Sequence, residues 1–169
     1  MISVTKIKDR NGHEQLKIEN AIILRMPFRN LEGRPTEYDK IGGKRSFSIL
    51  IEDPALADAM IADGWSVKPL RSIDPDEPPR FHLKILIGNR IPPIFLHSGN
   101  ATVGVDGRTI NDIDRADIIY ADLVVNPYHW KSPTGSGLSA YLNLMHVVLA
   151  DDPFAHKYSN PNADELPFD

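Results

Sequence analysis

Residues 80–87 read Arg-Phe-His-Leu-Lys-Ile-Leu-Ile, with apolar side chains at positions 81, 83, 85 and 87. Successive side chains of a β-strand point to opposite faces, so this period of two predicts a strand with one buried face. The opposite face carries three potential cations, Arg80, His82 and Lys84. Such a face suits a binding groove, although three polar residues on a strand also describe any exposed face.

Similar β patterns recur on both sides of this stretch. Strands are expected over residues 16–26, 44–51, 65–70, 91–98, 118–125 and 138–149, and a glycine-rich loop at 133–137 joins the last two as a hairpin. Asp53 and Pro54 open an alanine-rich segment that stops at Gly64, which predicts one short helix. The order predicts a mainly β fold, a small barrel or sandwich with extra strands or hairpins and one short α-helix.

The bulk composition limits the class of protein. A chain of 169 residues suits one domain with a real core. No apolar run approaches the roughly 20 residues that span a bilayer, and residues 1–6 lack the features of a secretion signal, so we expect a cytoplasmic location. The absence of cysteine excludes disulfides and thiolate catalysis.

The charge distribution divides the chain into two parts. Residues 1–150 hold 18 basic and 18 acidic side chains, whereas residues 151–169 hold one lysine and five acids. We therefore expect a neutral body at 1–150 and a flexible acidic tail at 151–169. A neutral body binds phosphates when its cations share one face.

Basic and aromatic side chains gather between residues 25 and 45. They are Arg25, Phe28, Arg29, Arg34, Tyr38, Lys40, Lys44 and Arg45. Single-stranded nucleic acid needs cations for its phosphates and flat groups on which its bases stack. A loop of 17 residues, 27–43, carries much of this set, so an ordinary solvated loop is the alternative.

A second aromatic cluster sits at the base of the expected hairpin. It combines Tyr128, His129, Trp130 and Lys131 before the turn with Tyr141 after it. These rings could grip a single strand, or Trp130 and Tyr141 could be a cross-strand pair that only closes the hairpin. Trp65 follows a helix-ending glycine, and we expect it in the core.

The sequence gives little support to catalysis. The acidic run with Asp112, Asp114 and Asp117 lacks the glycine and glutamate of a calcium loop, the six histidines are scattered, and no catalytic motif is present. We expect no enzyme, no cofactor and no metal site. The enzymatic rival is a metal-dependent nuclease that uses those three aspartates.

The chain ends in a short acidic segment with an apolar tip. It contains Asp164, Glu165, Leu166, Pro167 and Phe168, followed by Asp169. Acidic residues keep such a segment solvated, while Phe168 offers an anchor that fills a pocket. The segment is predicted to dock on partner proteins.

Several segments together resemble one known family. They are Ile18-Glu19-Asn20-Ala21, Asp63-Gly64-Trp65-Ser66-Val67-Lys68, Asn126-Pro127-Tyr128-His129-Trp130 and Ser139-Ala140-Tyr141-Leu142. From Ile18 to Leu149 the chain resembles the OB-fold single-stranded-DNA-binding proteins of tailed bacteriophages. The resemblance implies a five-stranded barrel with decorations and sequence-tolerant binding of single-stranded DNA in replication or recombination, without cofactor or reaction. The ending is similar to the Asp-Asp-Asp-Ile-Pro-Phe ending of bacterial relatives, which recruits partner enzymes, but Asp169 shifts the terminal carboxylate by one residue.

These observations give one hypothesis for the site. The candidate DNA-binding residues are Arg25, Phe28, Arg29, Arg34, Tyr38, Lys44, Arg45, Arg80, Lys84, Tyr128, Trp130, Lys131 and Tyr141. The alternative is a β-rich phage structural or assembly module whose aromatics face a protein. The sequence does not separate DNA from RNA, and it leaves a homo-oligomer open.

Overall fold

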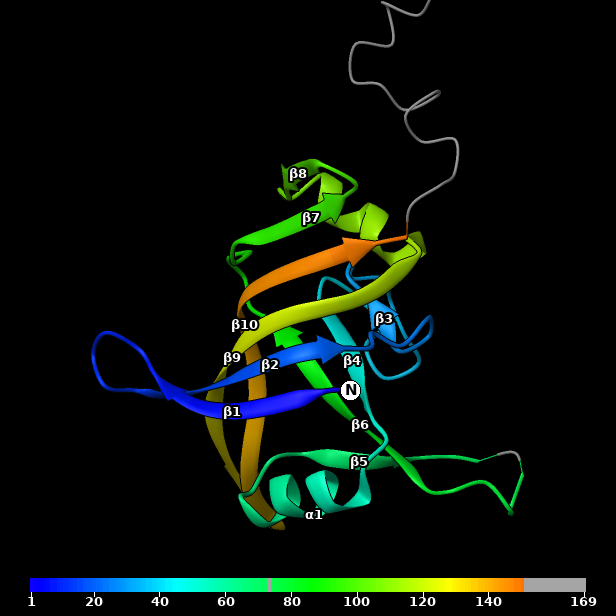
Figure 1. Ribbon diagram of the computed structural model, residues 1–169. Coiled ribbons are helices and arrows are strands. Elements are labelled where there is room, and N and C mark those ends of the chain that lie inside the picture. The colour runs from blue at the N-terminus through cyan, green and yellow to red at the C-terminus, as the bar shows by residue number, and fades with distance from the viewer. Residues whose placement is uncertain (73, 151–169) are drawn as a thin grey trace, which may run out of the picture.

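The computed structural model describes residues 1–72 and 74–150. Within them the elements follow in the order β1 (Ser3–Lys8), β2 (Glu14–Ala21), β3 (Arg29–Asn30), β4 (Arg45–Ile51), α1 (Pro54–Ala62), β5 (Val67–Leu70), β6 (Arg80–Ile87), β7 (Ile94–Ser98), β8 (Ala101–Gly104), the 3-10 helix η1 (Thr109–Arg115), β9 (Ile118–Ser132) and β10 (Gly135–Leu149). Figure 1 shows the strands wrapped around one axis, with helical segments at the two ends.

Five strands close into a barrel in the order β2, β9, β10, β6, β4. The seam lies between β4 and the residues after β2, where Leu50 N donates to Ile22 O and Leu24 N donates to Ser48 O, both at 2.9 Å. Strands β6 and β10 run parallel, and the other neighbours in the barrel run antiparallel. This is the five-stranded Greek-key barrel of the OB-fold. The predicted fold class is confirmed.

The alternating pattern of residues 80–87 determines which side chains enter the core. Leu83 and Ile85 on β6 are fully buried, as are Phe47 and Ile49 on the neighbouring β4. Each such side chain contributes about 1.5–3 kcal/mol relative to an exposed position. Because the apolar residues point inward, the intervening residues of both strands point away from the core.

Helical segments cover the two ends of the barrel (Figure 1). The predicted short helix is α1, where the Asp53 side chain accepts a hydrogen bond from Ala55 N at 3.0 Å and Met60 is buried. At the other end, η1 buries Ile110 and Ile113. The sequence did not predict η1, because its polar residues resemble those of a loop.

The first predicted strand, over residues 16–26, is divided between two partners. Strand β2 ends at Ala21 after Asn20 takes a φ of 59° and the register with β9 shifts. Residues 22–24 then pair with β4 across the seam. The single strand predicted from the sequence therefore pairs with β9 in its first part and with β4 in its second part, and this double pairing closes the barrel.

The last two strands are longer than predicted. Strand β9 ends at Ser132 and β10 begins at Gly135, so only Pro133 and Thr134 separate them. The glycines at 135 and 137 belong to β10, although glycine is normally depleted in β-strands. A long two-stranded ribbon thus replaces the expected loop at 133–137.

Some strands gave no clear signal in the sequence. Strand β1 pairs with β2 to form a hairpin that extends away from the barrel (Figure 1), and β8 pairs with β7. Their side chains are largely exposed, so apolar periodicity does not mark them. No helix in the described residues is long and apolar enough to cross a membrane.

Candidate nucleic-acid interface

The outward face of β4 and β6 is the surface from which the site is built. The register aligns Ser46 with Leu86, Ser48 with Lys84 and Leu50 with His82. On the other side of β6, Lys68 of β5 is aligned with His82. Lys84 and Lys68 are exposed, so two ammonium groups stand on this face. The contribution of Lys68 was not predicted, although its alternation with buried Val67 could have indicated it.

Parallel pairing with β10 extends this face into the β9–β10 hairpin. Tyr141 is the partner of Leu86 on β6. Its ring lies against Tyr128 of β9, with centroids 5.7 Å apart and the planes at 66°. Tyr128 is 57% exposed. The two tyrosines therefore continue the outward face of β6 with aromatic surface.

Trp130 lies further along the same side of the hairpin. Alternation along β9 places its side chain on the side of Tyr128, and its partner across the hairpin is Gly137. A Cβ atom on Gly137 would stand 2.8 Å from Cζ2 of the Trp130 indole. The indole thus packs directly on the glycine backbone. The alternative interpretation, a cross-strand pair of Trp130 with Tyr141, is wrong, since Tyr141 is aligned with Asn126.

Phe28 brings a fourth ring from the loop between residues 25 and 44. Its carbonyl accepts a hydrogen bond from Ser48 N at 2.9 Å, which ties the loop to β4. The Phe28 ring meets the His82 ring edge-on, with centroids 5.3 Å apart. The loop therefore adds an aromatic group beside β6.

His82 contributes a neutral ring to this surface. Its Nδ1 lies 3.1 Å from the Ser48 hydroxyl. Burial, and then the positive charges of Lys68 and Lys84, lower the pKa of His82 from its ordinary value of 6.5. The imidazole is therefore uncharged near neutral pH, and the lysines carry the positive charge.

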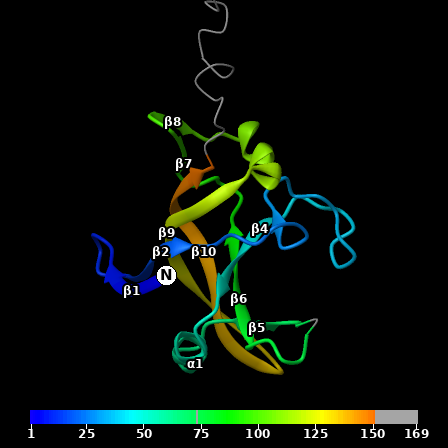
Figure 2. The same ribbon diagram turned by 45° about the vertical axis from the view of Figure 1, so that its right-hand side comes forward.

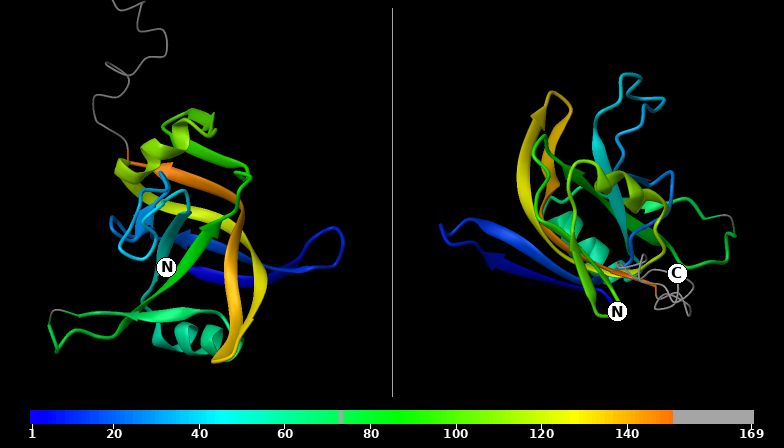
Figure 3. Two further views of the ribbon diagram at one scale, coloured as in Figure 1. Left: turned by 180° about the vertical axis from the view of Figure 1, so that it is seen from behind. Right: turned by 90° about the horizontal axis from the view of Figure 1, so that it is seen from above.

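We call this surface the aromatic-basic face. It comprises Phe28, Lys68, His82, Lys84, Tyr128, Trp130 and Tyr141. Figure 3 shows the loop 25–44 and the β9–β10 hairpin on either side of β4 and β6, both extending to the same side of the barrel.

The structure contradicts the prediction that Arg29 lines a groove. Arg29 is only 3% exposed, and its guanidinium donates to five backbone carbonyls. Two of these belong to residues 23 and 24 after β2, and three belong to residues 113, 114 and 116 at the end of η1. Burial lowers the pKa of Arg29. The side chain joins the loop to η1 and offers no accessible charge.

Arg34 and Arg45 also form hydrogen bonds that hold the loop. Arg34 donates to Arg29 O at 3.0 Å and lies 3.6 Å from the Asp114 carboxylate. Arg45 donates through Nε to Leu31 O at 2.8 Å, and its position on β4 is on the inward side with Phe47. Both side chains are half-buried and bound to the loop, and whether they also contact a ligand stays a prediction.

The remaining predicted cations are exposed. Arg25 forms a weak ion pair with Asp117 at 3.6 Å, and both side chains are solvated. Lys44 precedes β4, Arg80 begins β6 on the outward side, and Lys131 lies near the hairpin turn. Whether these side chains contact a ligand stays a prediction.

Tyr38 stands apart from the other predicted rings. It is 95% exposed at the tip of the loop. Figure 2 shows this tip extending well away from the barrel. No ring contact in the described residues joins Tyr38 to the aromatic-basic face.

The acidic run does not form a metal centre in the described residues. Asp114 is 4% exposed and accepts hydrogen bonds from Leu31 N and Glu32 N at 2.6 and 3.2 Å. No group of three metal-ligating side chains gathers in the part of the chain that the structure describes. The Asp114 carboxylate therefore holds the backbone of the loop in place. It is not available as one of the three metal ligands that the nuclease alternative requires.

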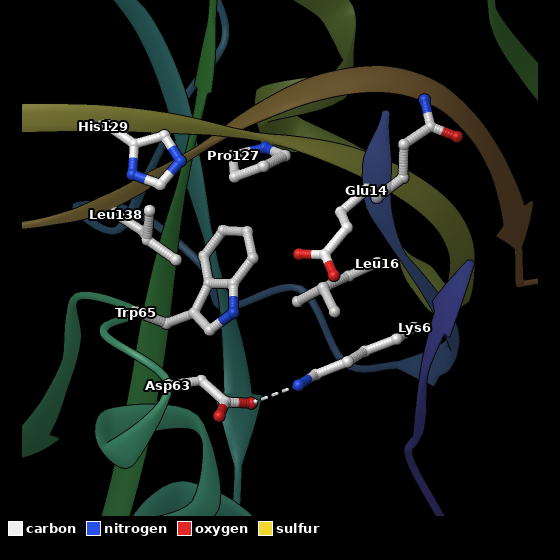
Figure 4. A pocket seen from close by; sticks show the side chains of 9 residues that line it. Lys6, Glu14, Leu16, Asp63, Trp65, Pro127, His129 and Leu138 are labelled. Atoms are coloured by element: carbon white, nitrogen blue, oxygen red, sulfur yellow. Dashed lines mark ion pairs between the residues drawn. The ribbon is translucent and has the colours of Figure 1, made fainter. Parts of the chain in front are cut away.

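A small pocket lies on the opposite side of the hairpin. Figure 4 shows Trp65 at its centre, with the Lys6 ammonium and the Asp63 carboxylate paired at 3.1 Å. Pro127 and His129 line it, so alternation along β9 separates the pocket from Tyr128 and Trp130. Trp65 is 7% exposed, which confirms its predicted place in the core.

The predicted docking segment lies outside the described residues. This segment consists of Asp164, Glu165, Leu166, Pro167 and Phe168.

The barrel and its outward face define a class of protein. Rings and lysines on neighbouring strands of a Greek-key barrel, flanked by a long loop and a long hairpin, are the architecture of an OB-fold oligonucleotide-binding protein. The model of the family described as "putative phage ssDNA-binding domain" matches residues 5–168. The chain belongs to that family, and the resemblance found in the sequence is confirmed.

Solved structures with a similar fold come from bacteriophage Enc34. The C-terminally truncated single-stranded DNA-binding protein of that phage is 16% identical, with a TM-score of 0.54, and the alignment covers 90% of this chain and 98% of that one. The same phage protein in complex with ssDNA is 16% identical, with a TM-score of 0.52 and the same coverage. At this identity the likeness establishes the fold. No curated protein sequence matches the chain.

Replacing Arg29 tests the loop anchor. Arg29→Met removes the donors of the carbonyls at residues 23, 24, 113, 114 and 116. We expect the free energy of unfolding in urea to fall by about 2–4 kcal/mol, since buried carbonyls lose charge-assisted partners. Arg25→Met is the matched control and should change stability by less than about 0.5 kcal/mol, as exposed substitutions usually do. Equal effects of the two substitutions would contradict the anchor.

Replacing Gly137 tests the seat of Trp130. Gly137→Ala puts a methyl group where the indole now lies, so the ring must move. With 5-fluorotryptophan incorporated, we expect the ¹⁹F resonance of Trp130 to shift while that of Trp65 stays in place. Ser136→Ala, on the neighbouring exposed residue, should leave both resonances unchanged. An unshifted Trp130 resonance in Gly137→Ala would show that the indole does not rest on the glycine.

Proposed function

We propose that the chain binds single-stranded DNA along the aromatic-basic face, without preference for base sequence. The observation that carries this proposal is the convergence of rings from distant segments on the side where Lys68 and Lys84 stand. Tyr128, Trp130 and Tyr141 come from the hairpin, and Phe28 comes from the loop.

The chemistry of the face favours an unpaired strand. Each base stacked on a ring contributes about 1–3 kcal/mol, and every base has a flat face, so stacking tolerates any sequence. In a duplex those faces are already stacked on neighbouring bases. Lysines neutralise phosphates without reading base edges, which again carries no sequence information.

Exposed cations around the face extend the proposed phosphate track. Arg25 and Lys44 lie at the two ends of the loop, Arg80 begins β6, and Lys131 lies on the hairpin. The fold likeness to a phage protein solved in complex with ssDNA supports the same use of the barrel. The family description names the same ligand.

The proposed biological role is binding without a chemical step. We propose that the protein coats single-stranded DNA during phage replication or recombination in the cytoplasm of the host cell. Residues 1–150 would form the DNA-binding domain, and residues 151–169 would be an acidic tail that recruits protein partners. The support for the tail is its sequence resemblance to the endings of bacterial relatives.

Titration of a fluorescent oligo-dT tests the binding mode. Affinity should fall steeply with salt, with a slope in log–log form of about −0.7 for each neutralised phosphate. Tyr141→Ala should weaken binding by about 5- to 150-fold, the loss of one stacked base. Lys84→Ala should weaken binding and flatten the salt slope by about 0.7.

Matched variants and competitors complete that titration. Lys8→Ala, which removes an exposed lysine on β1, should leave affinity and slope unchanged. Duplex DNA should compete poorly, and oligo-rU shows how far the sugar matters. Salt-independent binding, or equal affinity for duplex DNA, would overturn the proposal.

Truncation tests the role of the tail. Deleting residues 164–169 removes three acids, Asp164, Glu165 and Asp169, that would repel phosphates. We expect oligo-dT affinity to stay equal or rise, while co-purification of host replication or recombination proteins is lost. A truncated chain that still retains those proteins would exclude the tail as their docking segment.

A further inference from the structure

The tip of the loop 25–44 exposes two large apolar side chains. Tyr38 is 95% exposed and Ile41 is 93% exposed, and we call this pair the apolar knob. Single exposed apolar residues are common, but two almost fully exposed apolar side chains within four residues indicate a contact surface. Lys40 stands between them and has no ion pair in the described residues.

The loop presents the knob on an ordered turn. Thr36 N donates to Asp39 O at 2.7 Å, and Gly42 N donates to the Asp39 carboxylate at 3.3 Å. At the base of the tip, Gly43 N donates to Gly33 O at 2.7 Å. An ordered turn loses little conformational entropy when it docks.

An apolar pocket lies elsewhere on the barrel. It has a volume of about 420 Å³ and is lined by Met1, Ile2, Asn20, Ile22, Leu50, Glu52 and Asp53. Aliphatic side chains make up most of its lining, and Glu52 and Asp53 add two carboxylates, of which that of Asp53 caps α1. The knob offers the complementary features, an aromatic ring and an aliphatic side chain beside an ammonium group.

The knob and the pocket of one molecule do not meet. Figure 2 and the view from above in Figure 3 place the N-terminus, which lines the pocket, and the loop on opposite sides of the barrel. A contact between them therefore joins two copies. Because the two surfaces differ, the contact is head-to-tail and repeats along a row of copies instead of closing into a dimer.

We propose that the apolar knob of one copy docks in the apolar pocket of the next copy along a shared DNA strand, so that the copies bind cooperatively. This inference rests on the proposed binding of single-stranded DNA and deepens it. Lys40 of one copy would face Glu52 of its neighbour.

The small size of the contact explains why two copies would associate on DNA and not in free solution. Stable interfaces between free proteins bury roughly 1,200–2,000 Å², and two side chains with their surroundings fall well short of that. Copies held side by side on one strand experience an effective concentration of about millimolar, at which a weak contact becomes populated. We therefore expect monomers in solution and clusters on long single strands.

Comparing short and long oligonucleotides measures this contact. Oligo-dT of increasing length first defines the shortest strand that holds one copy, and poly-dT then gives the cooperativity between neighbours. Tyr38→Ala should lower the cooperativity by at least about fivefold, the effect of losing a significant interface residue. The affinity for the one-copy oligonucleotide should stay within about twofold of the unmodified chain.

A charge exchange identifies the partner surface. Lys40→Glu and Glu52→Lys should each reduce cooperativity, and the double variant should restore it, because the two charges attract again. Lys8→Glu makes the same charge change on exposed β1 and should have no effect on cooperativity.

Three outcomes would overturn the inference. If Tyr38→Ala weakens the one-copy oligonucleotide as much as poly-dT, the ring stacks on DNA instead. If the double exchange fails to restore cooperativity, the knob does not dock in this pocket. If the unmodified chain binds poly-dT without cooperativity, no contact between copies exists, while the proposed DNA binding still stands. Failure to bind either strand would instead refute the proposed function itself.

Discussion

The parallel pairing of β6 with β10 is the interaction on which the site depends. It aligns Ile85 with Ala140 inside the barrel and Leu86 with Tyr141 outside it. Without this pairing, the lysine of β6 and the rings of the hairpin would lie on unrelated surfaces. A shift by one residue would also turn Tyr141 inward and Ala140 outward, since strand side chains alternate. The fully buried Ile85 and Ala140 resist such a shift, so packing in the core fixes the position of the outer rings.

In the loop between β2 and β4, arginine side chains stabilise the fold by hydrogen bonds to backbone carbonyls. Its arginines looked like phosphate ligands in the sequence, yet Arg29 donates to the carbonyls of residues 23, 113 and 116, where the barrel closes and η1 ends. A buried carbonyl without a partner is costly, and a guanidinium with five donors can serve several at once. The anchored loop then places Phe28 against His82, beside the lysines. The rings and the two lysines, more than the arginines, make up the aromatic-basic face.

Periodic patterns made much of the fold predictable. The alternation over residues 80–87 gave β6 with its true bounds, and the capping Asp53 gave the helix. The hairpin rings Tyr128 and Tyr141 were placed correctly together because a turn between two β patterns leaves few alternatives. Lys68 was missed because a four-residue strand gives a weak pattern. Arg29 was misplaced because sequence does not reveal which backbone carbonyls a fold brings around a buried guanidinium. Long-range pairings such as β6 with β10 arise from three-dimensional closure of the barrel, which local patterns do not encode.

Photocrosslinking gives the most direct test of the central claim that one outward face carries the strand. Oligo-dT with 5-bromodeoxyuridine at single positions would be irradiated in complex with the full chain, and the crosslinked residues would be identified by mass spectrometry. The account predicts crosslinks at Phe28, Tyr128, Trp130 and Tyr141, in an order that follows the position of the label. Crosslinks concentrated on the β1–β2 hairpin, or around Trp65 on the other side of the β9–β10 ribbon, would contradict it.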